Sequence, residues 1–351
     1  MRPRADLRAA LRSLFVAALA GALGFGAIAG LGAGLTACGA PSSGAGGTPS
    51  TSGAAPAAAS AAASPRPVRA FPGGPVASAA HMNVAYAHAS PLQRLDLYLP
   101  ATGEPPYPVL VGIHGGGFVS GDKRDGQITP VLRGLDRGYA VANLDYRLAP
   151  EAPFPAAVAD VKTAVRWLRA HAVVYGLDGS RIAVWGDSAG GNLAAIAGTS
   201  GDSAALRGPD PAYAGRSDAV QAVVDWFGPI SFSLLDEDFR TAGHDATGAE
   251  GPASYPSQYL GAPVATVPGT ARAADPITYL SPDDPPILIE HGTDDGTVPW
   301  PQSRRLAEAY AAATGTDNVT LHLIPGAGHV DPVFYSARHV DRVLDWLDAH
   351  L

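Results

Sequence analysis

Ser188 lies in a turn whose composition could make a serine hydroxyl a nucleophile. The turn reads Gly-Asp-Ser-Ala-Gly over residues 186–190, after the apolar run 181–185 and before helix-forming residues at 193–197. Glycines on both sides allow a sharp reversal that presents the serine Oγ at the end of a strand, and a helix starting there directs its positive end toward the same point. A Gly/Ser loop without chemistry is the alternative, but the flanking strand and helix patterns favour a nucleophile.

A base and an acid for Ser188 follow in later turns. A serine hydroxyl is too weak an acid to attack a carbonyl carbon unaided, so it needs a histidine base that a carboxylate orients. His329 lies in a glycine-rich turn after one apolar run, and Asp294 and Asp295 lie in a turn after another. In an open parallel sheet such turns share the edge where ligands bind. Asp331 is a poorer acid candidate, because it is too close to His329 in sequence to reach the far side of its ring easily.

A glycine-rich loop at residues 114–118 could stabilise the negative oxygen that such an attack creates. Consecutive glycines let backbone N–H groups approach a substrate without obstruction, and the residue after the nucleophile offers a further N–H. We therefore assign the oxyanion hole to Gly116, Gly117 and Ala189, with His114 orienting the loop. A loop whose glycines serve only tight packing is the alternative.

Three aromatic residues near these turns, Phe118, Tyr146 and Trp300, are candidates for the wall of an acyl or aryl pocket. We expect no metal ion and no cofactor, because the remaining histidines have no spacing typical of metal ligands. Those histidines are His81, His88, His171, His244, His322, His339 and His350.

The elements that must position these residues alternate between short apolar runs and amphipathic stretches. This alternation predicts an α/β domain with a mostly parallel central sheet covered by helices on both faces. Strands are expected near 95–99, 109–113, 139–144, 181–185, 221–226, 286–290 and 319–324, and helices near 156–171, 193–197, 303–313 and 334–347.

Residues 229–282 interrupt this alternation. They are rich in Gly, Pro, Tyr and Asp, and only Leu234 to Arg240 has a helical pattern. A long irregular insertion in a compact domain is often a functional loop, so we expect a lid-like segment; an ordinary surface excursion is the alternative.

The N-terminal region has the pattern of an export signal followed by a tether. Residues 1–37 combine early arginines with a long uncharged run, and Leu-Thr-Ala-Cys at 35–38 resembles the lipobox of bacterial lipoproteins, in which the cysteine is lipidated. We expect residues 1–37 to be a signal peptide and Cys38 to anchor the protein to a membrane; an uncleaved membrane anchor is the alternative. Residues 38–74 are a predicted flexible linker, and residues 75–351 form the predicted catalytic domain.

Charge and cysteine content limit the partners of the exported part. Without residues 1–37 the chain has 20 basic and 31 acidic residues, so its formal charge is −11 and nucleic acid is not an expected partner. Cys38 is the only cysteine, so the domain relies on its core without disulfides. Both readings of the N-terminus place the domain outside the cytoplasm, attached to the cell membrane or secreted.

Several motifs in the correct order resemble the α/β-hydrolase fold over nearly all of residues 76–351. His-Gly-Gly-Gly-Phe at 114–118 resembles the oxyanion loop of hormone-sensitive-lipase-like esterases. The segments 145–151 and 154–157 are similar to a second signature of that group, and 186–191 matches its nucleophile turn.

The acid turn departs from that group. His-Gly-x-x-Asp-x-x-Val-Pro at 291–299 is similar to secreted feruloyl or acetylxylan esterases and to prolyl-oligopeptidase catalytic domains. This resemblance implies that Asp295 is the triad acid and Asp294 its neighbour in the loop.

The resemblance implies a serine carboxylesterase that forms an acyl-enzyme on Ser188, with small-molecule or polysaccharide-linked short-chain acyl, acetyl or feruloyl esters as substrates. A prolyl-oligopeptidase-like peptidase and a non-catalytic binding protein with a hydrolase fold are the alternatives.

Overall fold

The computed structural model describes residues 80–208 and 213–351. The predicted signal peptide at 1–37, Cys38 and the linker at 38–74 lie outside the described residues and stay predictions. Within the described ranges, no helix has both the length and the hydropathy needed to cross a bilayer.

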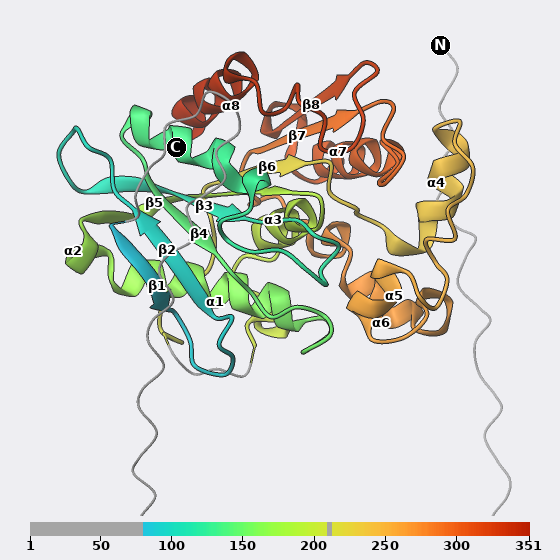
Figure 1. The fold of residues 1–351 in the computed structure, drawn as a ribbon, viewed down its shortest axis with the longest axis horizontal. Coiled ribbons are helices and arrows are strands. Elements are labelled where there is room, and N and C mark those ends of the chain that lie inside the picture. The colour runs from blue at the N-terminus through green and yellow to red at the C-terminus, as the bar shows by residue number, and fades with distance from the viewer. Residues whose placement is uncertain (1–79, 209–212) are drawn as a thin grey trace, which may run out of the picture. The chain divides into compact units, whose positions relative to one another are not determined.

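A sheet of eight strands forms the centre of this part of the chain, in the order β1-β2-β4-β3-β5-β6-β7-β8 (Figure 1). β2 pairs antiparallel with both β1 and β4, and all other neighbours are parallel, which confirms the predicted mostly parallel sheet. Only β1 was not expected. The strands are β1 (His81–Ala85), β2 (Arg94–Tyr98), β3 (Tyr107–Ile113), β4 (Ala140–Leu144), β5 (Leu177–Asp187), β6 (Ala222–Trp226), β7 (Ile287–Gly292) and β8 (Val319–Ile324).

Helices cover both faces of the sheet, as predicted. Along β3, Val109, Val111 and Ile113 belong to one apolar cluster and Leu110 to a second, because successive side chains of a strand point to opposite faces. Burial on both faces explains why the central strands are continuous apolar runs. The first cluster includes residues of α1 (Ala156–Ala170), α3 (Ala189–Thr199) and α7 (Pro301–Thr314), and the second includes residues of the 3₁₀ helix η1 (Gly126–Arg137) and α8 (Ala337–His350). Figure 1 shows α8 and α1 on opposite sides of the strands.

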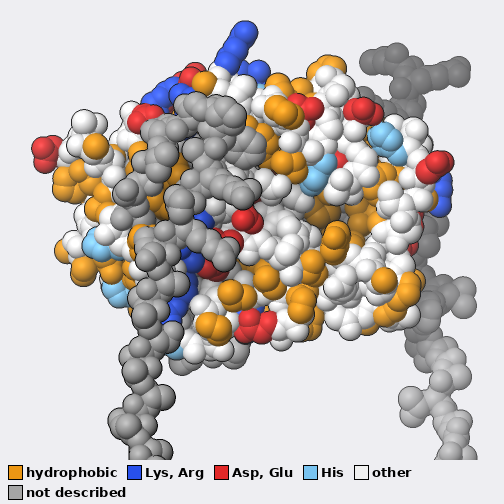
Figure 2. All heavy atoms as spheres, in the orientation of Figure 1, with side chains coloured by type: hydrophobic (Ala, Val, Ile, Leu, Met, Phe, Trp, Pro, Cys, Tyr) orange, Lys and Arg blue, Asp and Glu red, His pale blue; other side chains and the backbone are white. Residues whose placement is uncertain are grey.

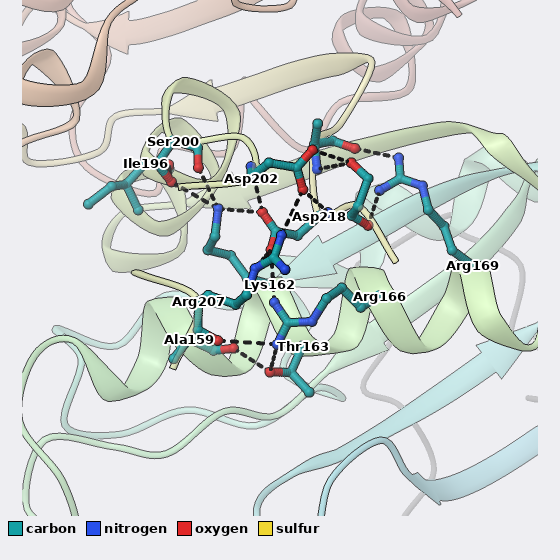
Figure 3. Close-up of polar contacts among 12 residues, drawn as sticks. Ala159, Lys162, Thr163, Arg166, Arg169, Ile196, Ser200, Asp202, Arg207 and Asp218 are labelled. Atoms are coloured by element: carbon teal, nitrogen blue, oxygen red, sulfur yellow. Dashed lines mark hydrogen bonds and ion pairs between the residues drawn. The ribbon is translucent and has the colours of Figure 1, made fainter. Parts of the chain in front are cut away.

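A buried ionic network attaches α1 to the loop that follows α3 (Figure 3). Asp218 receives Lys162 Nζ at 2.7 Å and Arg166 Nη1 at 2.8 Å, and all three side chains are fully buried. Lys162 also donates to the Ser200 carbonyl at the end of α3 at 2.6 Å. Lys162 and Asp218 together therefore join α1, the end of α3 and the loop before β6. A short helix, α2 (Ala172–Tyr175), follows α1 and ends at Gly176, which has a φ of 68°.

The insertion at 229–282 is more regular than predicted, and the expectation of an irregular segment with one short helix is wrong. Three of its helical segments begin with a proline in the first turn, where the missing N–H costs no hydrogen bond, and this signal was overlooked. Figure 1 shows α4, α5 and α6 grouped at one end of the domain. The helical segments are η3 (Phe232–Leu234), α4 (Leu235–Thr241), α5 (Tyr255–Leu260), η4 (Val264–Thr266), α6 (Pro268–Ala273) and η5 (Pro276–Tyr279).

The face drawn in Figure 2 has acidic and basic side chains in small separate groups, with apolar and uncharged surface between them. No single sign of charge dominates this face, so a ligand approaching it meets a mixed surface.

Candidate active site

Ser188 occupies the sharp turn between β5 and α3. Its φ of 53° and ψ of −120° are unusual for a residue with a side chain, and its N–H is fixed by the Trp226 carbonyl at 2.8 Å. The glycines around it are required by contact: a Cβ on Gly186 would lie 2.1 Å from the Gly190 carbonyl oxygen. A Cβ on Gly190 would lie 2.1 Å from the carbonyl oxygen of Ile113. Gly186 and Gly190 therefore let the backbone segments around the turn pack closely. This packing places Ser188 at the carboxyl edge of the sheet.

His329 connects Ser188 to Asp295. His329 Nε2 lies 3.0 Å from Ser188 Oγ, and its Nδ1 lies 2.7 Å from Asp295 Oδ2. Phe227 packs edge-to-face against the imidazole, with ring centres 4.8 Å apart. The structure thus brings together Ser188, Asp295 and His329, the three residues that the sequence pattern selected. They follow β5, β7 and β8, respectively. This geometry suits proton transfer from the serine to the histidine.

Asp295 is fully buried and has partners on both oxygens. Its Oδ1 accepts hydrogen bonds from the N–H groups of Thr297 at 2.8 Å and Val298 at 2.9 Å. Its Oδ2 lies 2.7 Å from His329 Nδ1 and 3.2 Å from His291 Nε2. Burial alone would raise the pKa of Asp295, but the hydrogen bonds from His291 and His329 hold it well below its usual value. The carboxylate is therefore ionised and oriented throughout the neutral range.

The two alternative acids lie elsewhere. Asp294 is exposed, and its backbone N–H donates to the Ala327 carbonyl at 2.9 Å. Asp331 accepts from the Val333 N–H at 2.9 Å, within its own turn. Asp295 is thus the carboxylate that contacts the His329 ring.

The three N–H groups assigned to the oxyanion hole are free of protein acceptors. Gly116 and Gly117 have φ values of 106° and 64°, the left-handed region that glycine favours. Within the described residues, none of the N–H groups of Gly116, Gly117 and Ala189 donates to another protein group. Free donors beside Ser188 are suited to stabilising a negative oxygen if one forms there.

Tyr146 supports the glycine loop from behind and does not line a pocket, so that prediction is wrong. The ring is fully buried and stacks on His114 with centres 4.3 Å apart. Its hydroxyl donates to the His114 carbonyl at 2.8 Å, and His114 Nδ1 lies 2.8 Å from the Gly115 carbonyl oxygen. Burial lowers the pKa of His114, so its ring is neutral and acts in the loop as a structural group. The spacing of Tyr146 in the sequence does not show on which side of the glycine loop its ring packs.

A cavity of about 600 Å³ opens beside Ser188. Phe118 is part of its wall, as predicted, whereas Trp300 is not among the lining residues. Trp300 lies before α7, with the Arg304 guanidinium 5.0 Å from its ring centre. Most of the remaining wall comes from the insertion, including Phe232, residues 247–249 and residues 253–256. The insertion therefore borders the site, although it is not an irregular loop.

Sequence reasoning missed one residue of the site, His291. His291 lies four residues before Asp295, a spacing that could have indicated their contact. Asp187 is buried beside the nucleophile, and neither carboxylate oxygen has a hydrogen-bond partner among the described residues. Burial raises the pKa of Asp187 to about 7.

Among the described residues, no group of three or more His, Cys, Asp or Glu side chains could hold a metal ion.

Comparison with known proteins finds esterases among the proteins that this chain is similar to. Esterase LipQ of Mycobacterium tuberculosis is 31% identical over 227 residues, which cover 63% of this chain and 50% of LipQ. The chain spans about half the length of the curated relatives it matches.

Solved structures with the same fold include a truncated carbohydrate esterase from gut microbiota. It has a TM-score of 0.68 and 28% identity, covering 78% of this chain and 96% of its own. Esterase 2 of Thermogutta terrifontis, phosphoramylated by tabun, has a TM-score of 0.59 and 26% identity, covering 79% of this chain and 96% of its own. These similarities confirm the predicted α/β-hydrolase fold and the resemblance to its esterases.

The BD-FAE family model matches residues 95–310, which is more than half of the chain and includes Ser188 and Asp295. The chain therefore belongs to the BD-FAE family and has the α/β-hydrolase fold.

Proposed function

We propose that the protein is a serine carboxylesterase. The observation that carries this proposal is the continuous contact from Ser188 Oγ through His329 to Asp295, with heavy-atom distances of 3.0 and 2.7 Å. Esterases among the relatives and structural neighbours support the same reaction class.

The reaction follows from the positions of these groups. Ser188 Oγ attacks the ester carbonyl carbon while His329 Nε2 takes the hydroxyl proton, and Asp295 stabilises the resulting imidazolium. The carbonyl oxygen becomes negative and accepts hydrogen bonds from Gly116, Gly117 and Ala189. Loss of one such donor costs about 3 kcal/mol of transition-state stabilisation.

Collapse of this intermediate breaks the ester C–O bond, and His329 returns the proton to the departing alcohol. Water then attacks the acyl-enzyme with His329 again as base, which releases the acid and restores Ser188.

The test compares Ser188, which follows β5, with Ser180 near the other end of that strand. Ser188→Ala should abolish hydrolysis of p-nitrophenyl acetate and labelling by a fluorophosphonate, because it removes the nucleophile. Ser180→Ala, at the exposed opposite end of β5, should keep both. Turnover by folded Ser188→Ala protein would overturn the proposal, and a wild-type protein that is folded but never labelled would favour a binding role.

For substrates we propose short-chain acyl, acetyl or feruloyl esters, either as small molecules or attached to polysaccharide. Among the described residues that line the cavity beside Ser188, none has a charged side chain, which favours neutral esters. Rates on p-nitrophenyl esters, methyl ferulate, acetylated xylan and aminoacyl anilides would distinguish these classes. Preferred cleavage of the anilides would support the peptidase alternative instead.

We further propose that the protein acts outside the cytoplasm, anchored through lipidated Cys38 or secreted. The support is the lipobox-like sequence at 35–38. Mass spectrometry of the mature N-terminus should find a diacylglyceryl cysteine, and Cys38→Ala should move the protein out of the membrane fraction. An unmodified chain that starts at Met1 would contradict this proposal.

A further inference from the structure

Tyr255 is a large aromatic residue exposed at the edge of the cavity that contains Ser188. It is the first residue of α5 in the insertion, and 58% of its surface is exposed. Ser254 fixes the start of this helix, because its side chain accepts a hydrogen bond from the Ser257 N–H at 3.2 Å. The backbone that carries Tyr255 is thus held at a defined position, although the side chain is exposed.

One face of the Tyr255 ring covers the glycine loop. A Cβ built on Gly117 would lie 2.9, 3.0 and 3.2 Å from Cγ, Cδ2 and Cδ1 of Tyr255. Three nearly equal distances place that point above the ring plane rather than beyond its edge. The glycine at 117 therefore leaves room for the ring to lie flat against the backbone that supplies an oxyanion donor. More than half of the Tyr255 surface is still exposed, so the glycine loop covers only part of the side chain.

Tyr255 and Ser188 border the same cavity, together with Gly117 and Phe118. A substrate whose carbonyl oxygen reaches the Gly117 N–H must therefore pass beside the Tyr255 ring. The cavity wall has no charged group that would attract an ionic substituent at this point. An exposed aromatic face beside a neutral pocket is suited to a flat ring. It attracts another aromatic ring by offset stacking beyond the area they bury, and it can bury the apolar C–H face of a sugar ring.

We propose that the outer face of Tyr255 binds a ring carried by the ester and so determines substrate preference. This inference rests on the proposed esterase function. The ring can belong to either half of the ester, since feruloyl esters carry an aromatic ring in the acyl part and acetylated xylosides carry a sugar ring in the alcohol part. Tyr255 contacts the substrate and takes no part in proton transfer.

The experiment measures kcat and KM of the wild type, Tyr255→Leu and Tyr255→Phe on three esters. Methyl ferulate has the ring in the acyl part, methyl acetylxyloside has it in the alcohol part, and ethyl acetate has none. Tyr255→Leu should lower kcat/KM for at least one ring ester, mainly through KM, by about three- to tenfold more than for ethyl acetate. Tyr255→Phe should match the wild type, because it keeps the ring.

The ring ester whose kcat/KM falls in Tyr255→Leu shows which half of the substrate, acyl or alcohol, lies on Tyr255. An equal loss on all three esters would overturn the inference, because it would indicate that Tyr255 only supports the glycine loop. No loss on either ring ester would overturn it as well. If the wild type hydrolyses neither these three esters nor p-nitrophenyl acetate, the proposed function fails together with the inference. Hydrolysis of ethyl acetate without ring selectivity rejects the inference alone.

Discussion

His291 Nε2 lies 3.2 Å from Asp295 Oδ2, the same carboxylate oxygen that His329 contacts. His291 is fully buried, and its Nδ1 lies 2.6 Å from Ser303 Oγ at the start of α7. Asp295 is thus fixed from two directions, and its contact with His291 links the turn after β7 to the following helix.

We expect His291→Asn to lower kcat on p-nitrophenyl acetate by about ten- to 100-fold, because a small displacement of Asp295 misorients the His329 ring. KM should change little, since His291 does not border the cavity. Asp294→Asn is the matched control and should stay within about twofold of the wild type, as its side chain is exposed. Equal losses in the two variants would contradict the role assigned to His291.

Asp187→Asn should stabilise the protein at alkaline pH. The pKa of Asp187 is raised from 3.8 to about 7 because the carboxyl is buried. A raised pKa means that stability falls as pH rises from about 4 to about 7, where the buried group becomes charged, and stays lower above that. The advantage of Asp187→Asn in thermal unfolding should therefore be greater at pH 8 than at pH 5. A variant less stable than the wild type at pH 8 would show that the ionised carboxylate has a partner.

Glu290→Gln should destabilise the protein at neutral pH. Glu290 is buried, and its Oε2 lies 2.7 Å from both Trp226 Nε1 and His339 Nε2, while Oε1 lies 3.0 Å from His322 Nδ1. Arg342 Nη2 is 3.5 Å from the same Oε1. Burial alone would raise the pKa of Glu290, but hydrogen bonds from His322 and His339 lower it from 4.5 to about 2.

Since this pKa is lowered, the stability that Glu290 contributes is present above about pH 4.5 and is lost as pH falls toward 2. The wild type should exceed Glu290→Gln by about 3 kcal/mol in urea unfolding at pH 7, and the difference should shrink at pH 3. A difference that is independent of pH would exclude the carboxylate charge as its cause.

Asp218→Asn should be among the most destabilising single changes outside the active site. It leaves Lys162 and Arg166 fully buried without their shared carboxylate, and breaking such a pair costs about 3–5 kcal/mol. Lys162→Met should cost less, because Arg166 and Asp218 remain paired. Chemical unfolding measures both, and kcat of the folded fraction should match the wild type. A larger loss for Lys162→Met would contradict this account of the network.

The strands, and the three polar residues that meet at the sheet edge, could be predicted from the sequence because both depend on local signals. Ser188, Asp295 and His329 each follow an apolar run, and parallel strands bring their carboxyl ends to one edge. The choice between Asp294 and Asp295 needed a family resemblance, since adjacent residues after a strand point in different directions.

What sequence did not predict depends on contacts between distant segments. The burial of Tyr146 under His114, the contact of His291 with Asp295 and the position of Tyr255 over Gly117 have no periodic pattern. The short helices of the insertion were missed because each is too brief to produce an amphipathic stripe, although proline marks several of their starts.

The cavity takes much of its wall from residues 247–256, whereas Ser188, Asp295 and His329 follow strands of the central sheet. Under the proposed function, the choice of ester and the cleavage of its bond are therefore encoded in separate stretches of the gene. Random mutagenesis confined to codons 247–256 should yield a library in which substrate range varies while the hydrolytic machinery is inherited intact.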